Sequence, residues 1–234
     1  MNKIVLIAGA DTQLGIEMCR HFKSLEYQVV KIISSITDPV ENIDEKYVFK
    51  LSSSSIVAIR SVILKATTYW NSINQFIIIQ DSNLGDSNLL NDEPLLSIDQ
   101  KVDQHFKKYI FLSREILYYL KNVQNADFGL LALVGTIPLP TTSKRDISVA
   151  PPLRAALAGA FSSLASALSG EIFEKTGIVH YFETVPGWLE AKESANNEYA
   201  EFIVETIMQY PRQKTGRRFR YPSRSFTRMR RKKI

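Results

Sequence analysis

The chain has 234 residues, of which 45% are hydrophobic, and this length predicts a single domain with one sizeable core. No apolar stretch reaches the roughly 18 residues of a membrane-spanning helix, and the apolar run Ile4–Ala10 is too short for a cleavable leader. Cys19 is the single cysteine, which excludes an internal disulfide and fits a cytoplasmic protein, and one Cys with three His argues against a metal site; the net charge is +5.

The N-terminal segment predicts a strand, a turn and a helix. Lys3–Ala8 is an apolar run with β-branched residues, typical of a strand that is buried on both faces of a parallel sheet. After Gly9, Leu14, Met18 and Phe22 recur at helical spacing, so a helix is expected to begin near Thr12 or Gln13. This arrangement directs backbone N–H groups and the positive end of a helix dipole to a point where a phosphate can bind.

The glycines of this turn allow two interpretations. Gly9 and Gly15 match the first and last glycines of a dinucleotide-binding turn, but Gln13 stands where a middle glycine would let the backbone approach a pyrophosphate. Alternatively, Gly9 serves only the turn and Gly15 only close packing of the helix, with no ligand.

Strands and helices are expected to alternate along the rest of the chain. Further strands are predicted at 27–34, 47–51, 75–79, 130–134, 177–185 and 217–221, and helices at 56–71, 98–122, 153–173 and 199–209. This order predicts an α/β fold with a doubly wound parallel sheet, Rossmann-like and in one domain. Ser34 ends the second strand, where an acidic residue would favour NAD and an arginine NADP; a serine favours neither.

Over residues 3–222 the order of elements resembles the short-chain dehydrogenase/reductase family. Besides Gly9 and Gly15, the resemblance rests on Pro186-Gly187 after a strand, on Thr215-Gly216 before an edge strand, and on the small-residue helix 153–173. It implies that NAD(P) is a possible cofactor and that helix 153–173 packs two subunits into a homodimer. The cofactor-binding positions that it implies are Gly9, Asp11, Gln13, Leu14, Gly15, Ser34, Asp81, Pro186 and Gly187.

The catalytic residues of that family are not found. The family uses a tyrosine as proton donor or acceptor, a lysine four residues later that lowers the pKa of the tyrosine, and a serine that orients the substrate oxygen. Aligned by its small residues, helix 153–173 has Arg154 at the tyrosine position and Ala158 at the lysine position. The serine position falls on Gly135 or Thr136, and no tyrosine lies between positions 119 and 181.

Three residues are candidate substitutes in catalysis. Thr136 keeps a hydroxyl, His105 is titratable near neutral pH, and Arg154 could bind an anionic group through its guanidinium. Each also has an ordinary structural interpretation, as a turn residue, a partly exposed helical histidine and a surface arginine. Asp81 and Asp86 are a further pair, although Asp in such a loop is usually a turn residue.

The C-terminal segment is strongly basic. Residues 212–234 contain eleven Lys or Arg and no acidic residue, so the first 211 residues carry 18 basic against 24 acidic side chains. We place a domain at 1–222 and a basic tail at 223–234. The tail suits a membrane surface or nucleic acid equally well, or it serves only solubility.

Three functions follow from these observations. The first is a short-chain dehydrogenase/reductase-like protein without dehydrogenase activity, which binds or scaffolds other molecules and attaches through its basic tail. The second is an NAD(P)-dependent oxidoreductase with atypical catalytic residues such as Thr136 and His105. The third is a nucleic-acid-associated protein whose folded domain presents the tail.

Overall fold

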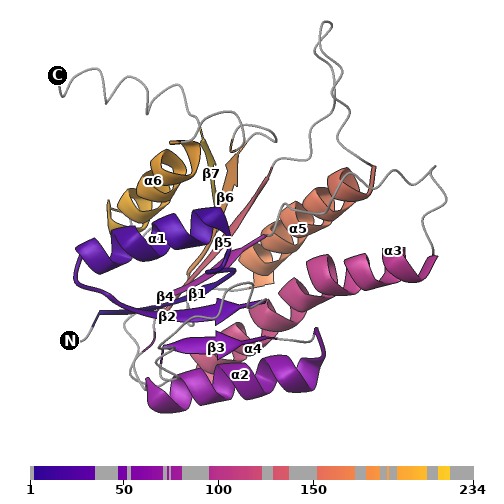
Figure 1. The fold of residues 1–234 in the computed structure, drawn as a ribbon, viewed down its shortest axis with the longest axis horizontal. Coiled ribbons are helices and arrows are strands. Elements are labelled where there is room, and N and C mark those ends of the chain that lie inside the picture. Colours follow the sequence, from indigo (N-terminus) through magenta and orange to yellow (C-terminus); the bar gives the residue numbers. More distant parts are fainter. Residues whose placement is uncertain are drawn as a thin grey trace, which may run out of the picture.

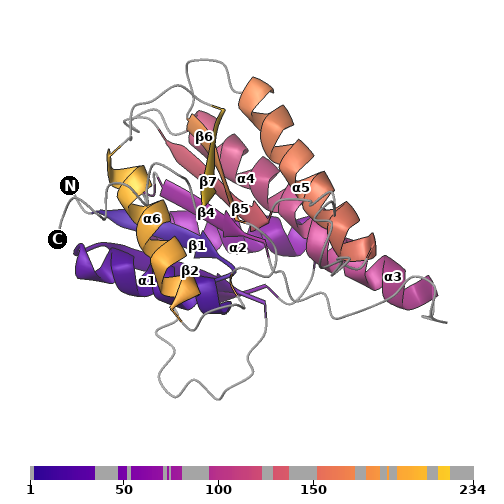
Figure 2. The ribbon, with the colours of Figure 1, turned by 90° about the horizontal axis from the view of Figure 1, so that it is seen from above.

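The computed structural model describes most of the chain as one parallel sheet between two layers of helices (Figures 1 and 2). The described residues are 3–34, 47–51, 54–70, 73, 75–80, 95–122, 129–136, 152–171, 178–184, 189, 194–209 and 216–221. The sheet has seven strands in the order β3-β2-β1-β4-β5-β6-β7, which confirms the predicted doubly wound α/β fold. No helix among the described residues is long and apolar enough to cross a membrane.

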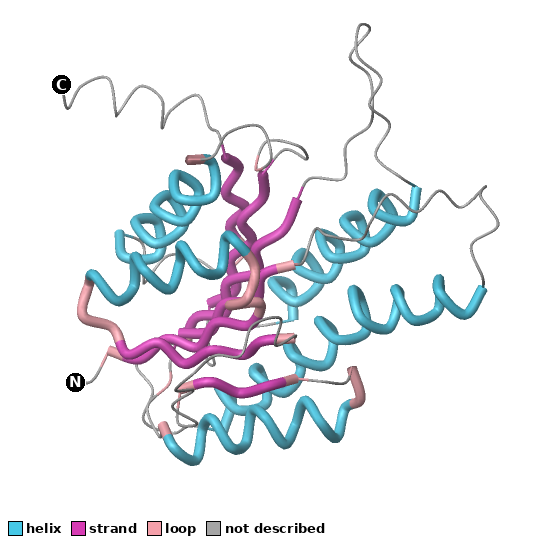
Figure 3. The backbone as a smooth tube through the Cα atoms, viewed as in Figure 1, coloured by secondary structure: helices cyan, strands magenta, loops and turns pink. Residues whose placement is uncertain are grey.

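The strands are short, and the central ones are buried over almost their whole length, as their apolar sequences predict. Figure 3 shows them side by side through the middle of the molecule. Their bounds are β1 Ile4–Ala8, β2 Gln28–Ile33, β3 Val48–Lys50, β4 Gln75–Ile79, β5 Leu130–Thr136, β6 Ile178–Thr184 and β7 Arg217–Tyr221. Every pair of neighbouring strands is parallel.

The helices cover the two faces of the sheet, and alternate residues of each strand point to opposite faces. Ile4 and Leu6 of β1 belong to the core beneath α2, α4 and α5, whereas Val5 and Ile7 belong to the core beneath α1 and α6. The helix bounds are α1 Gln13–Ser24, α2 Ile56–Tyr69, α3 Leu95–Val102, the π-helical turn η1 Asp103–Lys107, α4 Lys108–Asn122, α5 Pro152–Glu171 and α6 Ala195–Gln209.

The order in which the chain adds strands to the sheet reverses at β1. Strand β1 pairs with β2 on one side and with β4 on the other, so the chain proceeds outward first toward β3 and then toward β7. In open α/β sheets ligands bind at such a point, in the crevice outside the carboxyl ends of the strands. The fold therefore directs attention to the residues that follow β1, β2, β4 and β5.

Two helices differ from the sequence prediction. The helix expected at 98–122 begins at Leu95 and includes the π-helical turn η1, where the hydrogen-bonding pattern changes for five residues. The helix expected at 199–209 begins at Ala195, because the carbonyl of Ser194 accepts from the Glu198 N–H at 2.9 Å and its hydroxyl contacts the Glu198 carboxylate. The apolar pattern of Tyr199–Ile207 is strong, so the sequence predicts a helix start there and not at the earlier capping residue, Ser194.

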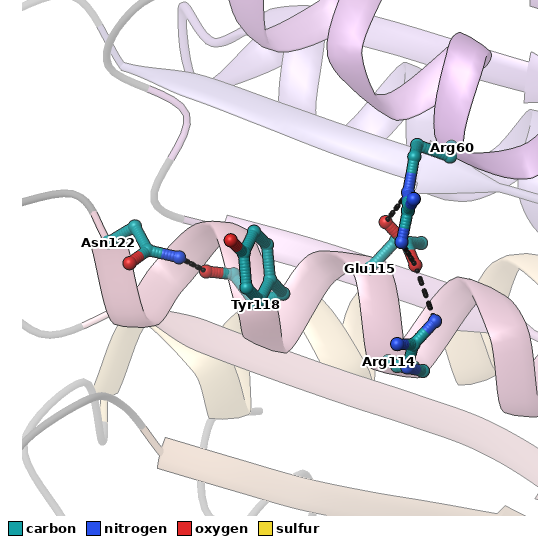
Figure 4. Close-up of polar contacts among 5 residues, drawn as sticks. All are labelled: Arg60, Arg114, Glu115, Tyr118 and Asn122. Atoms are coloured by element: carbon teal, nitrogen blue, oxygen red, sulfur yellow. Dashed lines mark hydrogen bonds and ion pairs between the residues drawn. The ribbon is translucent and has the colours of Figure 1, made fainter.

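A buried carboxylate joins α2 to α4 (Figure 4). The Glu115 side chain is only 7% exposed, and its oxygens accept from Arg60 Nε at 3.0 Å and Nη2 at 3.2 Å. Arg114 contributes a further bond at 3.1 Å, and the Glu115 hydrogen bond raises the pKa of Arg60. A buried charge needs such partners, and the cluster fixes the position of α4.

Arginines line the edge strand β7. The strand contains Arg217, Arg218 and Arg220. Its two aromatic residues, Phe219 and Tyr221, pack on the α6 side of the sheet. Arg218 and Arg220 both pair with Glu183 of β6, a carboxylate that is 1% exposed, at 3.2 and 2.8 Å. The sheet therefore ends in an ion-paired strand.

Candidate functional site

The turn after β1 is held by its own side chains and backbone. Thr12 caps α1: its hydroxyl donates to the carbonyl of Gly9 at 2.7 Å and accepts from the N–H of Gly15 at 3.0 Å. Gly9 has a φ of +84°, a conformation that favours glycine, and its N–H donates to the carbonyl of Ile32 at 3.0 Å. The structure thus confirms the predicted helix start at Thr12.

Packing explains both glycines of this turn. A Cβ on Gly15 would lie 2.2 Å from the carbonyl oxygen of Gly9, and a Cβ on Gly9 would lie 3.0 Å from that of Ile79. Their presence does not by itself require a ligand. The N–H groups of Gln13 and Leu14, at the start of α1, have no acceptor within the helix and form the positive end of its dipole. A phosphate oxygen would satisfy them.

The end of β2 brings together a carboxylate, a hydroxyl and an ammonium group. Asp11 Oδ2 accepts from the backbone N–H of Ser34 at 2.9 Å, and Lys108 Nζ at the start of α4 donates to Ser34 Oγ at 3.1 Å. The predicted residues Asp11 and Ser34 therefore lie together. Sequence reasoning missed Lys108, because it is 74 positions away from Ser34 and no local pattern links them.

The ends of β4 and β5 are closely packed against α5. Gln80 directly follows β4 and is 9% exposed; its Nε2 donates to the carbonyl of Leu157 at 3.3 Å. A Cβ on Gly135 would lie 2.9 Å from both Gln80 Oε1 and Phe161 Cδ1. On the face of β5 that α5 covers, Gly135 is thus closely packed against the side chains of Gln80 and Phe161.

The three candidate catalytic residues lie on three elements. Thr136 is the last residue of β5 and is partly buried, and its carbonyl accepts from the Tyr181 hydroxyl at 3.4 Å. His105 lies in η1, a kind of distortion that is frequent at functional sites, and Arg154 lies in the first turn of α5. Leu153 and Leu157 of α5 pack against residues on either side of His105, so α5 and η1 are neighbours. No hydrogen bond between the three candidates is found in the described part of the chain.

Several predicted positions lie outside the described residues. They are Asp81, Asp86, Pro186, Gly187, Thr215 and the basic tail at 223–234. Among the residues that are described, no group of three His, Cys, Asp or Glu side chains could hold a metal ion.

Comparisons with known proteins relate the chain to others through its fold. No protein-family model and no curated protein matches the sequence. Among solved structures, the NADH-dependent reductase A1-R', responsible for alginate metabolism, has 13% identity and a TM-score of 0.72, with 94% of this chain and 95% of that chain covered. A short-chain dehydrogenase/reductase from Serratia marcescens has 15% identity and a TM-score of 0.68, with 93% and 94% covered.

A third structure adds a cofactor to this comparison. An oxidoreductase of the short-chain dehydrogenase/reductase family from Brucella ovis, in complex with a partially ordered NAD, has 15% identity and a TM-score of 0.70, with 94% of this chain and 99% of that chain covered. The chain has the short-chain dehydrogenase/reductase fold. At these identities the likeness shows the fold alone.

Two residues of α5 align with the tyrosine and the lysine of the family, and they differ in their exposure to solvent. Arg154 is partly exposed, and Ala158 is 3% exposed in the packing of α5. The alignment itself stays a prediction.

Tyr181, a phenol beneath α5, is not an alternative proton donor. Tyr181 lies on β6, and burial, together with the nearby Glu183 carboxylate, raises its pKa to about 12. The Arg218 guanidinium lies 5.2 Å from the centre of its ring and acts in the opposite direction without reversing the shift. An acid–base catalyst near neutral pH needs a pKa near 7, so Tyr181 does not replace the missing tyrosine.

NAD(P), the cofactor that this fold implies, fits one half of the crevice. The turn after β1 offers backbone N–H groups for a phosphate, and Asp11, Ser34 and Lys108 offer polar groups for a ribose. At the ends of β4 and β5, Gln80 and Phe161 pack around Gly135 on the face of the sheet that α5 covers. The segments 81–94 and 137–151, which follow these two strands, lie outside the described residues.

Proposed function

We propose that this protein is a short-chain dehydrogenase/reductase-like protein that does not transfer hydride and instead holds a nucleotide or a partner protein. The observation that carries the proposal is the sequence of α5, in which Arg154 and Ala158 stand at the positions aligned with the tyrosine and the lysine. Gly135, one of the two residues at the serine position, has no room for a Cβ beside Gln80 and Phe161. Both observations support a protein without the proton-transfer residues of the family.

Catalytic assays test this proposal directly. The purified full chain is incubated with NADH or NADPH and a panel of ketones, aldehydes and quinones, and the absorbance at the nicotinamide band is followed. We expect no oxidation above the rate without protein. Turnover of any substrate would contradict the proposal.

A working reductase is the second candidate, favoured by the position of His105 in a π-helical turn beside α5. Its test uses the same assay on His105→Ala and Thr136→Ala. If the unmodified protein shows turnover and either variant lowers it tenfold or more, the atypical reductase is the better assignment.

We also propose a homodimer that forms through α5. The outward positions of this helix are occupied by small residues, among them Ala156, Ser163, Ala167 and Gly170, which would let a second backbone approach closely. A two-fold contact would use the same face in both subunits. Light scattering after gel filtration should give twice the mass of the chain, and Ala167→Arg should halve it. Val57→Arg, at an exposed position on α2, is the matched control.

The basic tail carries the last proposal, attachment to a polyanion through charge. Its support is compositional, since residues 223–234 hold six basic side chains and no acidic one. Binding to anionic vesicles and to duplex RNA or DNA is measured across a salt series, because counterion release makes nucleic-acid affinity fall with salt. Replacing Arg230, Arg231, Lys232 and Lys233 by Gln should abolish whichever interaction is found.

A further inference from the structure

Helix α2 carries apolar side chains on two opposite faces. Ile59 and Ile63 face the sheet and are buried, whereas Val57 and Leu64 are 75% and 58% exposed. A helix that covers one face of a sheet normally has polar residues on its outer side. Only two of the 14 residues of α2 are charged, however. The outer side of this helix is therefore more apolar than its place at the surface requires.

The exposed apolar residues of α2 border one groove. It has a volume of about 510 Å³, and its lining includes Val57, Leu64 and Tyr69, the last of which is 62% exposed. From Val57 to Tyr69 the groove follows the helix for roughly 18 Å, or about three turns. Single exposed apolar residues are ordinary, but a continuous apolar patch with a polar rim marks an interaction site.

Helix α4 adjoins this groove and holds it in shape (Figure 4). The Arg60 guanidinium lines the groove and donates to Glu115 of α4 at 3.0 and 3.2 Å. Tyr118 lies one turn further along α4, is 69% exposed, and is close enough to add to the rise in the Arg60 pKa that Glu115 causes. Because the ion pair joins the two helices, the groove is formed before any partner binds, which lowers the entropic cost of binding.

The rim of this surface is basic. Arg60 and Lys65 line the groove, and Arg114 is exposed beside them on α4. In α2 and α4 the single carboxylate is that of Glu115, which is 7% exposed and contacts both Arg60 and Arg114. Three cations against one buried carboxylate leave a positive surplus around the apolar side chains. A partner of complementary charge is therefore acidic.

An acidic amphipathic helix fits these features better than a second copy of the chain or a membrane. Val57, Leu64 and Thr68 form a stripe along α2 at helical spacing, and a second helix packs its own ridge of side chains beside such a stripe. A second copy would place Lys65 and Arg114 against the same cations. A bilayer surface takes up apolar side chains that protrude into it, whereas these side chains border a hollow.

We infer that the outer surface of α2, together with Tyr118 of α4, is a docking site for an amphipathic helix of a partner protein. The apolar face of that helix covers Val57, Leu64 and Tyr118, and acidic residues along its edge pair with Lys65 and Arg114. The inference rests on the proposed function in its partner-binding form. It goes further by giving the partner a surface and a chemistry.

Two designed peptides test this inference on the full chain. Both have leucines along one helical face and about 18 residues, long enough for a helix in water, and their polar edges carry either Glu or Lys. Fluorescence anisotropy should show the Glu peptide binding at least tenfold more tightly, with a difference that shrinks at high salt. Equal affinities, or no binding of the Glu peptide at millimolar concentration, would overturn the inference.

Substitutions in the groove separate it from the basic tail as the place of binding. Lys65→Glu should weaken binding of the Glu peptide at least tenfold and strengthen that of the Lys peptide, a reversal that binding to the tail would not produce. Leu64→Glu should weaken the Glu peptide to a similar extent. Leu96→Glu, at a leucine of α3 that is 69% exposed, is the matched control and should leave both affinities unchanged. Unchanged affinities in both groove variants, folded by circular dichroism, would refute the site.

The other two occupants are tested with the same Leu64→Glu variant. If it halves the mass of the chain in light scattering, the surface joins two copies. If it releases the chain from vesicles of phosphatidylcholine and phosphatidylserine, the surface binds a membrane. Either result would overturn the inference. NADH oxidation by the unmodified chain would instead refute the proposed absence of hydride transfer and leave the peptide result standing.

Discussion

The two halves of the crevice are both formed by strand ends and the helices beside them, but different interactions hold each half. On the β1–β2 side, Thr12 and Asp11 hold the backbone of the turn and of Ser34, and the polar groups of Ser34 and Lys108 meet at the strand end. On the β4–β5 side, Gln80 and Phe161 pack against Gly135 beneath α5. The comparison shows that polar contacts order the first half of the sheet edge, whereas close packing orders the second.

The largest effect is expected from Gly15→Ala in the first half. Its Cβ would lie 2.2 Å from the carbonyl oxygen of Gly9, so the backbone of the turn or of α1 must move. We expect a loss of about 3 kcal/mol or more in the free energy of unfolding, measured by denaturant titration. Gly170→Ala in α5 is the control: it meets nothing within 4 Å and should stabilise by roughly 0.5–1 kcal/mol.

Gly135→Ala should disturb the second half less severely, because the atoms it meets belong to side chains. We expect a loss of about 1–3 kcal/mol. In the Gln80→Ala background the loss should shrink, since the carboxamide oxygen is one of the two contacts at 2.9 Å. A double-mutant cycle by thermal unfolding measures this coupling. If the two losses of stability are strictly additive, the Gln80 side chain does not restrict the space for a Cβ at position 135.

Thr12→Ala tests whether the turn of the first half depends on its cap. The change removes the acceptor for the Gly15 N–H and the donor to the Gly9 carbonyl. Loss of such a cap costs about 1 kcal/mol. Thr12→Ser keeps the hydroxyl and should lie close to the unmodified protein. Equal stability of both variants would mean that the cap does not hold the turn.

The smallest effect concerns the charges at the end of β2. Asp11→Asn removes a negative charge beside Ser34, and Lys108→Met removes a positive one. We expect Asp11→Asn to raise, and Lys108→Met to lower, the affinity for 2′,5′-ADP relative to 5′-ADP, each by severalfold, and both shifts to shrink at high salt. Competition titrations measure the ratio. Shifts in the same direction would show that the 2′ position does not face this cluster.

The fold could be predicted from the sequence because each strand and helix has a strong local pattern. Lys3–Ala8 and Gln75–Ile79 are apolar without interruption, and Thr12 is a recognisable cap. The site could be predicted where a residue follows a recognisable strand, as Asp11 follows the first strand and its glycine turn and Ser34 follows the second. Lys108 and Gln80 were not among the predicted site residues, since their roles arise from contacts 74 and 77 positions away along the chain.

The arginines of β7 bear on whether the sheet can pair edge to edge with that of a second molecule. An outermost strand presents unpaired backbone groups that can recruit another sheet, and charged side chains on it oppose such growth. Here Arg218 and Arg220 share the single negative charge of Glu183, so with Arg217 the rim keeps a surplus of two positive charges. Two such rims would repel each other, which opposes pairing of β7 with the same strand of a second molecule.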